Sequence, residues 1–117
     1  MTRILIAEDE ARLAAFMEKG LRRDGYETAI AADGEQAVQM AQSGEFDLLL
    51  LDLGLPLKDG WLVLAELEEE QIHLPTIVVT ARDIVQEQLS VFRNGVKDYI
   101  MKPFRFKDLL ARVRLYL

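Results

Sequence analysis

The sequence has no cysteine and only one histidine, His73, among its 117 residues. The absence of cysteine excludes disulfide bonds, thiolate metal sites and a cysteine nucleophile, and one histidine cannot form a multi-imidazole site. No apolar run approaches the roughly 20 residues that a membrane span needs. No basic segment followed by an apolar one opens the chain as a secretion signal. The sequence therefore predicts a small cytoplasmic domain with no membrane partner.

Positive charge is also scarce, because the chain has 14 basic and 20 acidic residues and a net charge of −6. This balance disfavours binding of nucleic-acid phosphates by the chain as a whole. The charge is uneven, however, since residues 93–117 hold seven basic and two acidic residues. Half of the residues are apolar, which is enough for one hydrophobic core, so residues 1–117 are expected to form one domain.

The apolar pattern changes period repeatedly along the chain, and this indicates alternating strands and helices. Helical spacing relates Leu13, Phe16, Met17 and Leu21, and again Phe106, Leu110, Val113 and Leu117. Three of the strand-like runs are almost wholly apolar, as expected for strands covered on both faces. The pattern predicts an α/β fold with a doubly wound parallel sheet and helices on both sides. The five predicted strands are Arg3 to Ala7, Glu27 to Ala31, Asp47 to Leu51, Thr76 to Thr80 and Asp98 to Met101.

Turn residues mark the expected boundaries of the helices. Asp33 and Asp59 each precede a glycine near a predicted helix start. Gly20 lies inside the first predicted helix, where glycine costs about 1 kcal/mol relative to alanine. Glycines that can adopt the left-handed conformation follow three predicted helices, in Asp24-Gly25, Ser43-Gly44 and Asn94-Gly95.

Polar side chains follow four of the predicted strands, and in a doubly wound fold such strand ends meet at one edge of the sheet. Three carboxylates, one hydroxyl and one ammonium would share this site, with a summed charge of about −2 that favours a divalent cation. Oxygen ligands of this kind suit Mg²⁺ or Mn²⁺. The set fits phosphoryl transfer, with Asp52 as the nucleophile and Glu8 and Asp9 as metal ligands. The residues are Glu8, Asp9, Asp52, Thr80 and Lys102.

Each of these residues also has a simpler structural interpretation. Asp9 could cap the first helix, and Glu8 could be a solvated loop residue. Thr80 could end a strand or cap a helix, and Lys102 could extend into solvent. The functional interpretation depends on the coincidence of all five residues at the ends of four strands.

The pattern resembles the receiver domain of two-component response regulators, and the resemblance covers essentially the whole chain. The matching motifs are Glu8-Asp9, the stretch from Asp52 to Gly60, Thr80-Ala81 and Lys102-Pro103-Phe104. The segment Asp98 to Phe104, followed by Asp108 to Arg114, is most similar to the OmpR/PhoB-type subfamily. The resemblance implies a flavodoxin-like (CheY-like) (βα)5 three-layer sandwich with strand order 2-1-3-4-5.

The resemblance also implies a role for each site residue. Asp52 would accept a phosphoryl group from a histidine kinase or a small phosphodonor. Mg²⁺, for which Mn²⁺ may substitute, would be held by Glu8, Asp9, Asp52 and the backbone carbonyl of Gly54. Thr80 and Lys102 would contact the phosphoryl oxygens, and the Lys102–Pro103 bond would be cis. Tyr99 would turn inward as Thr80 moves toward the phosphate.

The sequence departs from the family pattern at three positions. Gly54 is smaller than the usual residue, so the site is expected to be more open, with altered access and autodephosphorylation. Gln88 replaces a basic residue and Lys97 an acidic one on the face made by the fourth helix, fifth strand and fifth helix. Because Lys97 would oppose a partner's basic helix, we expect a weaker or rearranged homodimer. Four residues of that face keep the usual sign: Asp98, Asp108, Arg112 and Arg114.

Three functions are compatible with these features. The subfamily implies a transcription factor with a C-terminal winged-helix DNA-binding domain that is absent from this chain. A stand-alone receiver that acts through protein–protein contacts is the second possibility. A haloacid-dehalogenase-type phosphatase is the third, but that family has a second aspartate where this chain has Gly54. The sequence therefore predicts a regulatory phosphoacceptor, limited to its own phosphorylation and autodephosphorylation, rather than an enzyme.

Overall fold

The computed structural model of the chain describes residues 1–81 and 95–117. The helix expected between the last two strands lies outside these residues. The order of elements within them is β1 (Arg3–Ala7), α1 (Ala11–Arg23), β2 (Glu27–Ala31), α2 (Gly34–Gln42), β3 (Leu48–Leu51), α3 (Gly60–Glu69), β4 (Thr76–Thr80), β5 (Val96–Met101) and α5 (Phe106–Leu115).

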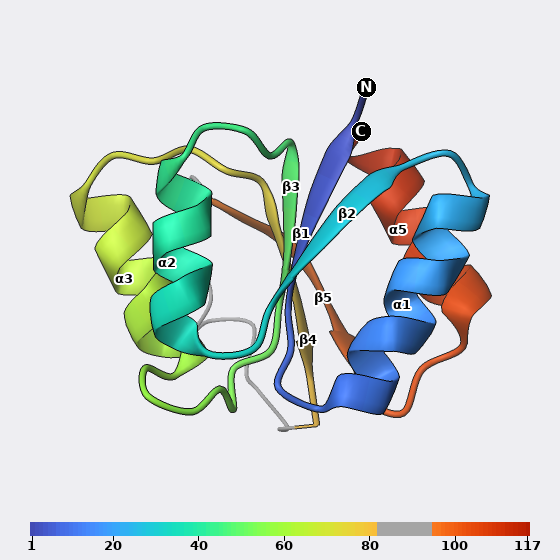
Figure 1. The fold of residues 1–117 in the computed structure, drawn as a ribbon, viewed down its shortest axis with the longest axis horizontal. Helices are drawn as coiled ribbons and strands as arrows, with labels where there is room; N and C mark the ends of the chain where they lie inside the picture. The colour runs from blue at the N-terminus through green and yellow to red at the C-terminus, as the bar shows by residue number, and fades with distance from the viewer. Residues whose placement is uncertain (82–94) are drawn as a thin grey trace.

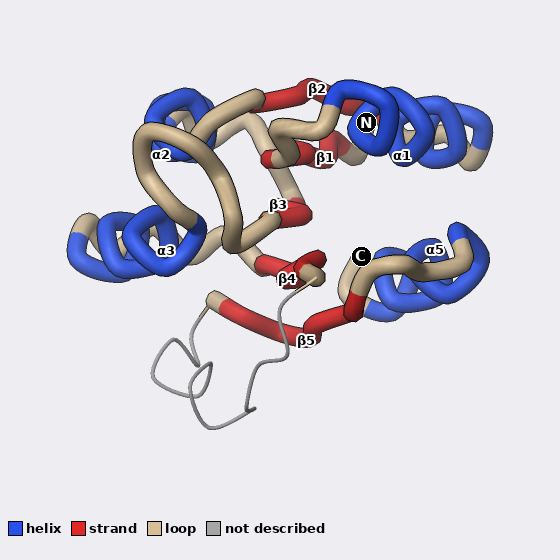
Figure 2. Tube along the Cα trace, turned by 90° about the horizontal axis from the view of Figure 1, so that it is seen from below, coloured by secondary structure: helices blue, strands red, loops and turns tan. Residues whose placement is uncertain are grey.

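The strands form one parallel sheet in the order β2-β1-β3-β4-β5, which confirms the predicted topology. Leu5 of β1 pairs with Ala29 of β2 on one side and with Leu49 of β3 on the other. Figure 2 shows α2 and α3 on one face of the sheet and α1 and α5 on the other. The strand order reverses between β1 and β3, and ligands of such folds bind at the carboxyl ends of strands beside this reversal.

Two apolar cores hold the helices against the sheet. Successive side chains of a strand point to opposite faces, so Leu49 and Leu51 of β3 pack toward α2 and α3. Leu48 and Leu50 of the same strand pack toward α1 and α5. All four leucines are buried, which is why this run is apolar throughout rather than alternating.

The observed strand bounds differ from the predicted ones at two places. β3 begins at Leu48 rather than at Asp47, whose carboxylate accepts a hydrogen bond from the backbone N–H of Arg3 at 2.9 Å. β5 begins at Val96, two residues earlier than predicted, because Val96 pairs with Thr76 before a shift in register. The polar residues that follow Val96 concealed this strand start in the sequence.

Two residues of the predicted helical stripes lie outside the core. Phe16 is 52% exposed, because it lies at the rim of α1, where its ring meets Phe106 edge to face at 5.8 Å. Leu117 is 44% exposed because α5 ends at Leu115. Leu109, which the predicted stripe omitted, is fully buried instead.

The turn residues act as predicted in the described part of the chain. The side chain of Asp33 accepts a hydrogen bond from the N–H of Gln36 at 2.8 Å, and that of Asp59 accepts one from Leu62 at 3.1 Å. These contacts cap α2 and α3. Gly25 and Gly44 have φ angles of 95° and 73°, which favour glycine. Asn94 lies outside the described residues.

Both termini lie at one edge of the sheet, and α1 begins at the opposite edge, where β1 ends (Figure 1). Among the residues that the structure describes, no helix is both long and apolar enough to cross a bilayer. The predicted site is therefore expected at the edge of the sheet where β1, β3 and β4 end.

Candidate functional site

The ends of β1 and β3 position two of the predicted carboxylates. The N–H of Glu8 donates to the carbonyl of Ala31 at the end of β2, and the N–H of Asp52 donates to the carbonyl of Ala7 at the end of β1, both at 3.0 Å. The sheet ladder thus continues as far as the two carboxylate residues. Their backbone positions are fixed by the strands, and only their side chains enter the site.

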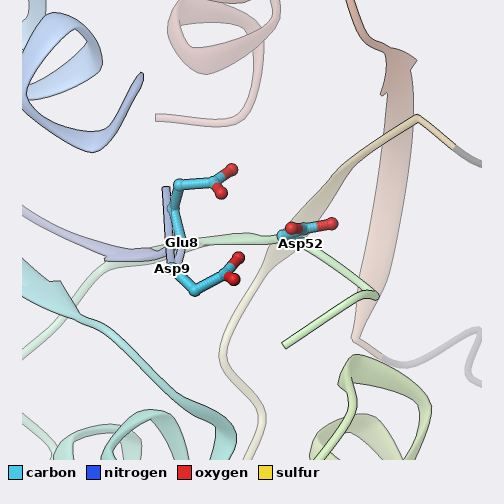
Figure 3. Close-up of side chains that lie close together, drawn as sticks. All are labelled: Glu8, Asp9 and Asp52. Carbon is cyan, nitrogen blue, oxygen red and sulfur yellow. The ribbon is translucent and has the colours of Figure 1, made fainter. Parts of the chain in front are cut away.

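Glu8, Asp9 and Asp52 form one carboxylate cluster, which we call the acidic cluster. Each offers an oxygen atom, and these atoms lie within 4.8 Å of one another. Figure 3 shows the three carboxyl groups converging from the ends of β1 and β3. Glu8 and Asp52 are buried while Asp9 is exposed, so the cluster has a closed side and an open side. The helix-capping alternative for Asp9 is wrong, because Glu10 occupies the N-cap of α1.

Lys102 supplies the positive charge of the site. Its Nζ lies 2.6 Å from Oε1 of Glu8 and 3.3 Å from Oδ2 of Asp52. The Lys102 side chain is only 15% exposed, so its extension into solvent is excluded. The peptide bond between Lys102 and Pro103 is cis, as the resemblance implied.

Burial and charge oppose each other within this group. Burial raises the pKa of Glu8, although the hydrogen bonds from Lys102 and from the N–H of Glu10 act against it. For Lys102, burial lowers the pKa, but the hydrogen bond and charge of Glu8 together with Asp52 outweigh it and raise the pKa overall. The Glu8 shift thus reflects burial above all, whereas the Lys102 shift reflects the two carboxylates that contact its ammonium.

Thr80 lies on β4, the strand beside β3, and Tyr99 lies on β5, the next strand outward in the sheet. Thr80 is buried at the end of β4, and its carbonyl accepts a hydrogen bond from the N–H of Lys102 at 2.9 Å. This contact places Thr80 and Lys102 on adjacent strand ends. Tyr99 pairs with Val78 and packs, half-buried, against the core on the side of α2 and α3.

Gly54 follows the acidic cluster by two residues and lies exposed at its mouth. Its N–H donates to Oδ1 of Asp52 at 3.1 Å. This hydrogen bond orients the carboxylate and leaves Oδ2 facing Lys102. The glycine adds no side chain there, and the more open site expected from the sequence stays a prediction.

The residues expected at the dimer face lie on β5 and α5, away from the acidic cluster. Asp98 and Arg112 form an ion pair within the chain, with Oδ2 and Nε 3.3 Å apart. Arg114 is paired with Asp24 at the end of α1, at 2.6 Å. Lys97 and Asp108 are exposed, and Gln88 lies outside the described residues.

The sequence predicts no role for the backbone contacts that shape the loop after Asp52. Gly34 contacts this loop and Gly60 ends it, but in the sequence both are recognisable only as residues near helix starts. The only signal in the sequence was the pair of Asp-Gly steps, which does not reveal that one of them touches a distant loop.

The chain is similar in sequence to a known family of signalling domains. The family model for the response regulator receiver domain matches residues 4–114. The chain is 38% identical, over its whole length, to the transcriptional regulatory protein PcoR of Escherichia coli, and 40% identical over 112 residues to the transcriptional activator protein IrlR of Burkholderia pseudomallei. The aligned regions cover 52% and 48% of those proteins, so the chain spans about half their length.

Solved structures give the same fold. The receiver domain of the Francisella response regulator 1452 superposes with a TM-score of 0.89 at 28% identity, over 99% of this chain and 96% of that one. The response regulator TrrA of Thermotoga maritima, solved in complex with Mg²⁺ and BeF, gives a TM-score of 0.86 at 29% identity, with both chains fully covered.

Proposed function

Because the chain belongs to the response regulator receiver domain family, whose members are regulatory phosphoacceptors, we propose that Asp52 is its phosphoryl acceptor. The observation that supports this proposal is the acidic cluster with Lys102 against it, since Nζ of Lys102 lies 3.3 Å from Oδ2 of Asp52. Asp52 is the cluster member at the centre of the sheet, between β1 and β4.

The donor set of the acidic cluster fits a Mg²⁺ ion, and Mn²⁺ can substitute for it. Three carboxylates and one ammonium leave a net charge of about −2, and hard oxygen donors with an open side suit a cation that keeps several waters. Glu8, Asp9, Asp52 and the carbonyl of Gly54 would hold the ion. When bound, it would neutralise charge on the phosphoryl oxygens.

In the proposed reaction, an Oδ atom of Asp52 attacks phosphorus and forms an acyl phosphate. The bond from phosphorus to the histidine nitrogen of a sensor kinase, or to the oxygen of a small phosphodonor, breaks and its electron pair leaves with the donor. Lys102 and the hydroxyl of Thr80 bind the phosphoryl oxygens. In autodephosphorylation, water attacks the same phosphorus, the bond from phosphorus to the Asp52 oxygen breaks, and inorganic phosphate leaves with the carboxylate restored. Gly54 leaves the approach of water open.

We further propose that phosphorylation is read out through Thr80 and Tyr99. The modification adds about −1.5 to −2 charges and three acceptor oxygens. Thr80 and Lys102 bind those oxygens better in one arrangement of the strand ends, and this preference shifts the population toward it. Tyr99, on the strand beside Thr80, turns inward in the shifted state.

The output is proposed to be control of transcription in the cytoplasm. The curated relatives are named as transcriptional regulators and are about twice as long as this chain, which supports a C-terminal winged-helix DNA-binding domain in the full-length protein. A stand-alone receiver that acts through protein contacts is the alternative. A gene that continues past Leu117 into such a domain favours the first function, and one that stops there favours the second.

The test is incubation with acetyl phosphate and Mg²⁺, followed by intact-mass measurement of the wild type and Asp52→Asn. The wild type is expected to gain one phosphoryl group, and the variant none, because the amide is a poor nucleophile. Asp47→Asn serves as the control, since Asp47 is exposed before the start of β3, outside both the acidic cluster and the loop after Asp52; it should be phosphorylated like the wild type. A phosphoryl group on Asp52→Asn would overturn the assignment.

A further inference from the structure

The loop that follows Asp52, residues 53–60, closes on itself beside the acidic cluster. The N–H of Gly60 donates to the carbonyl of Leu53 at 2.9 Å. A Cβ atom at Gly60 would lie 2.6 Å from Cα of Leu53 and 2.7 Å from the carbonyl oxygen of Asp52. The two ends of the loop are therefore in backbone contact, and the same loop carries Gly54.

The middle of the loop is held by its main chain. The N–H of Lys58 donates to the carbonyl of Pro56 at 2.7 Å, which closes a three-residue turn around Leu57. Leu57 has a φ of 66° and its side chain is 76% exposed. A positive φ is unfavourable for leucine, and such turns are rare. Because the Leu57 side chain packs against little, backbone contacts must maintain the turn.

The contact that maintains the turn around Leu57 comes from the first turn of α2. The N–H of Gly34 donates at 3.1 Å to the same carbonyl of Pro56 that accepts from Lys58. A Cβ atom at Gly34 would overlap the carbonyl oxygen of Lys58 and would lie 2.6 Å from its carbonyl carbon. The two nearest atoms are backbone, so a methyl group there must displace the loop. Gly34 is thus required by this close approach.

We propose that Gly34 is a positioning residue for the cation site, a role that rests on the proposed function of the acidic cluster. Because Gly34 has no side chain, the Lys58 carbonyl can lie against α2, and this contact fixes the position of the loop. The same loop presents the Gly54 carbonyl and orients Asp52 through the 3.1 Å hydrogen bond from the Gly54 N–H. The loop has little slack between these points, because its turn is closed by main-chain hydrogen bonds and its two ends are joined. A shift at Lys58 therefore reaches Gly54.

The first test is a calorimetric titration of Gly34→Ala with Mg²⁺. Loss of a group that orients metal ligands commonly weakens affinity by about 10- to 100-fold, and a loss in this range is expected. Gly20→Ala is the matched control, because its methyl group would also overlap a neighbour, the Phe106 ring, between α1 and α5. Thermal melts should show a loss of stability in both variants, and only Gly34→Ala should lose Mg²⁺ affinity.

A second measurement uses the wild type alone, and it tests the positioning role of Gly34 even if Gly34→Ala does not fold. If closure of the loop raises the affinity for the cation, binding of the cation must shift the loop toward its closed state by the same factor. Saturating Mg²⁺ should therefore slow hydrogen exchange of the Gly34 amide, which donates to Pro56. The Gly25 amide, which donates to Arg22 at 3.0 Å, is the control and should exchange at an unchanged rate.

The outcomes separate the two proposals. If the wild type does not bind Mg²⁺, the proposed function fails and this inference fails with it. If the wild type binds Mg²⁺ while Gly34→Ala binds it equally well, only the inference is wrong. Equal slowing of the Gly34 and Gly25 amides would likewise overturn the inference alone.

Discussion

Lys102 is the residue on which the balance of charge at the site depends. It contacts two carboxylates whose side chains are 2% and 11% exposed. Removal of one partner from a buried ion pair is costly because the other charge is left without compensation. The ammonium and a divalent cation thus neutralise the same carboxylates, and each should partly compensate for the absence of the other.

Lys102→Met should consequently destabilise the metal-free domain by about 3 kcal/mol. Added Mg²⁺ should restore a larger part of the unfolding free energy in this variant than it adds to the wild type. Urea unfolding with and without Mg²⁺ measures both effects. The control is Lys107→Met, at an exposed position of α5, which should leave both quantities unchanged. Equal gains from Mg²⁺ in Lys102→Met and the wild type would contradict this argument.

At the same scale, the sequence predicted the members of the acidic cluster because a residue at a strand end has its location fixed by the sheet. Glu8, Asp52 and Lys102 come from parts of the chain far apart in sequence, yet their contacts follow from topology alone. The role of Gly34 could not be predicted in this way. It depends on how closely α2 approaches a loop, and this distance is a result of packing rather than of any local pattern.

At the scale of elements, the contact between α1 and α5 explains why a glycine stands in the middle of α1. A Cβ atom at Gly20 would lie 2.6 Å from Cε1 of Phe106. The sequence showed only the propensity cost of this glycine, because Phe106 is 86 positions away along the chain. The helix is nevertheless continuous from Ala11 to Arg23, since the ring of Phe106 packs over the space that the glycine leaves.

Gly20→Ala should therefore destabilise the domain, although alanine favours helix by about 1 kcal/mol. Overpacking costs about 1–3 kcal/mol, so a net loss of about 1 kcal/mol is expected in urea unfolding. In a Phe106→Ala background the ring is absent, and the same substitution should stabilise the domain by about 1 kcal/mol. A loss of similar size in both backgrounds would show that Phe106 is not the cause.

At the scale of the whole molecule, the basic C-terminal segment lies on a domain with a net charge of −6. Two of its arginines are already paired within the chain, Arg112 with Asp98 and Arg114 with Asp24. An intermolecular ion pair that used either arginine would have to replace an existing one. This competition adds to the unfavourable sign of Lys97 in disfavouring a symmetric dimer through β5 and α5.

The domain treated with beryllofluoride and Mg²⁺ should accordingly form a weak or rearranged dimer. Lys97→Asp restores the acidic sign and should tighten association by about fivefold, equivalent to about 1 kcal/mol for an exposed ion pair. Sedimentation velocity over a concentration series measures this change. Lys107→Asp is the control for net charge and should have a smaller effect. A tight dimer of the unmodified sequence through that face would refute the prediction.

The exposed side chain of Leu57 offers a practical consequence. It projects from a turn that main-chain hydrogen bonds maintain, so its replacement should disturb the interior little. Since the chain contains no cysteine, Leu57→Cys would introduce a unique thiol three residues from Gly54. A fluorophore or spin label attached there would report on the loop beside the acidic cluster without any further engineering of the protein.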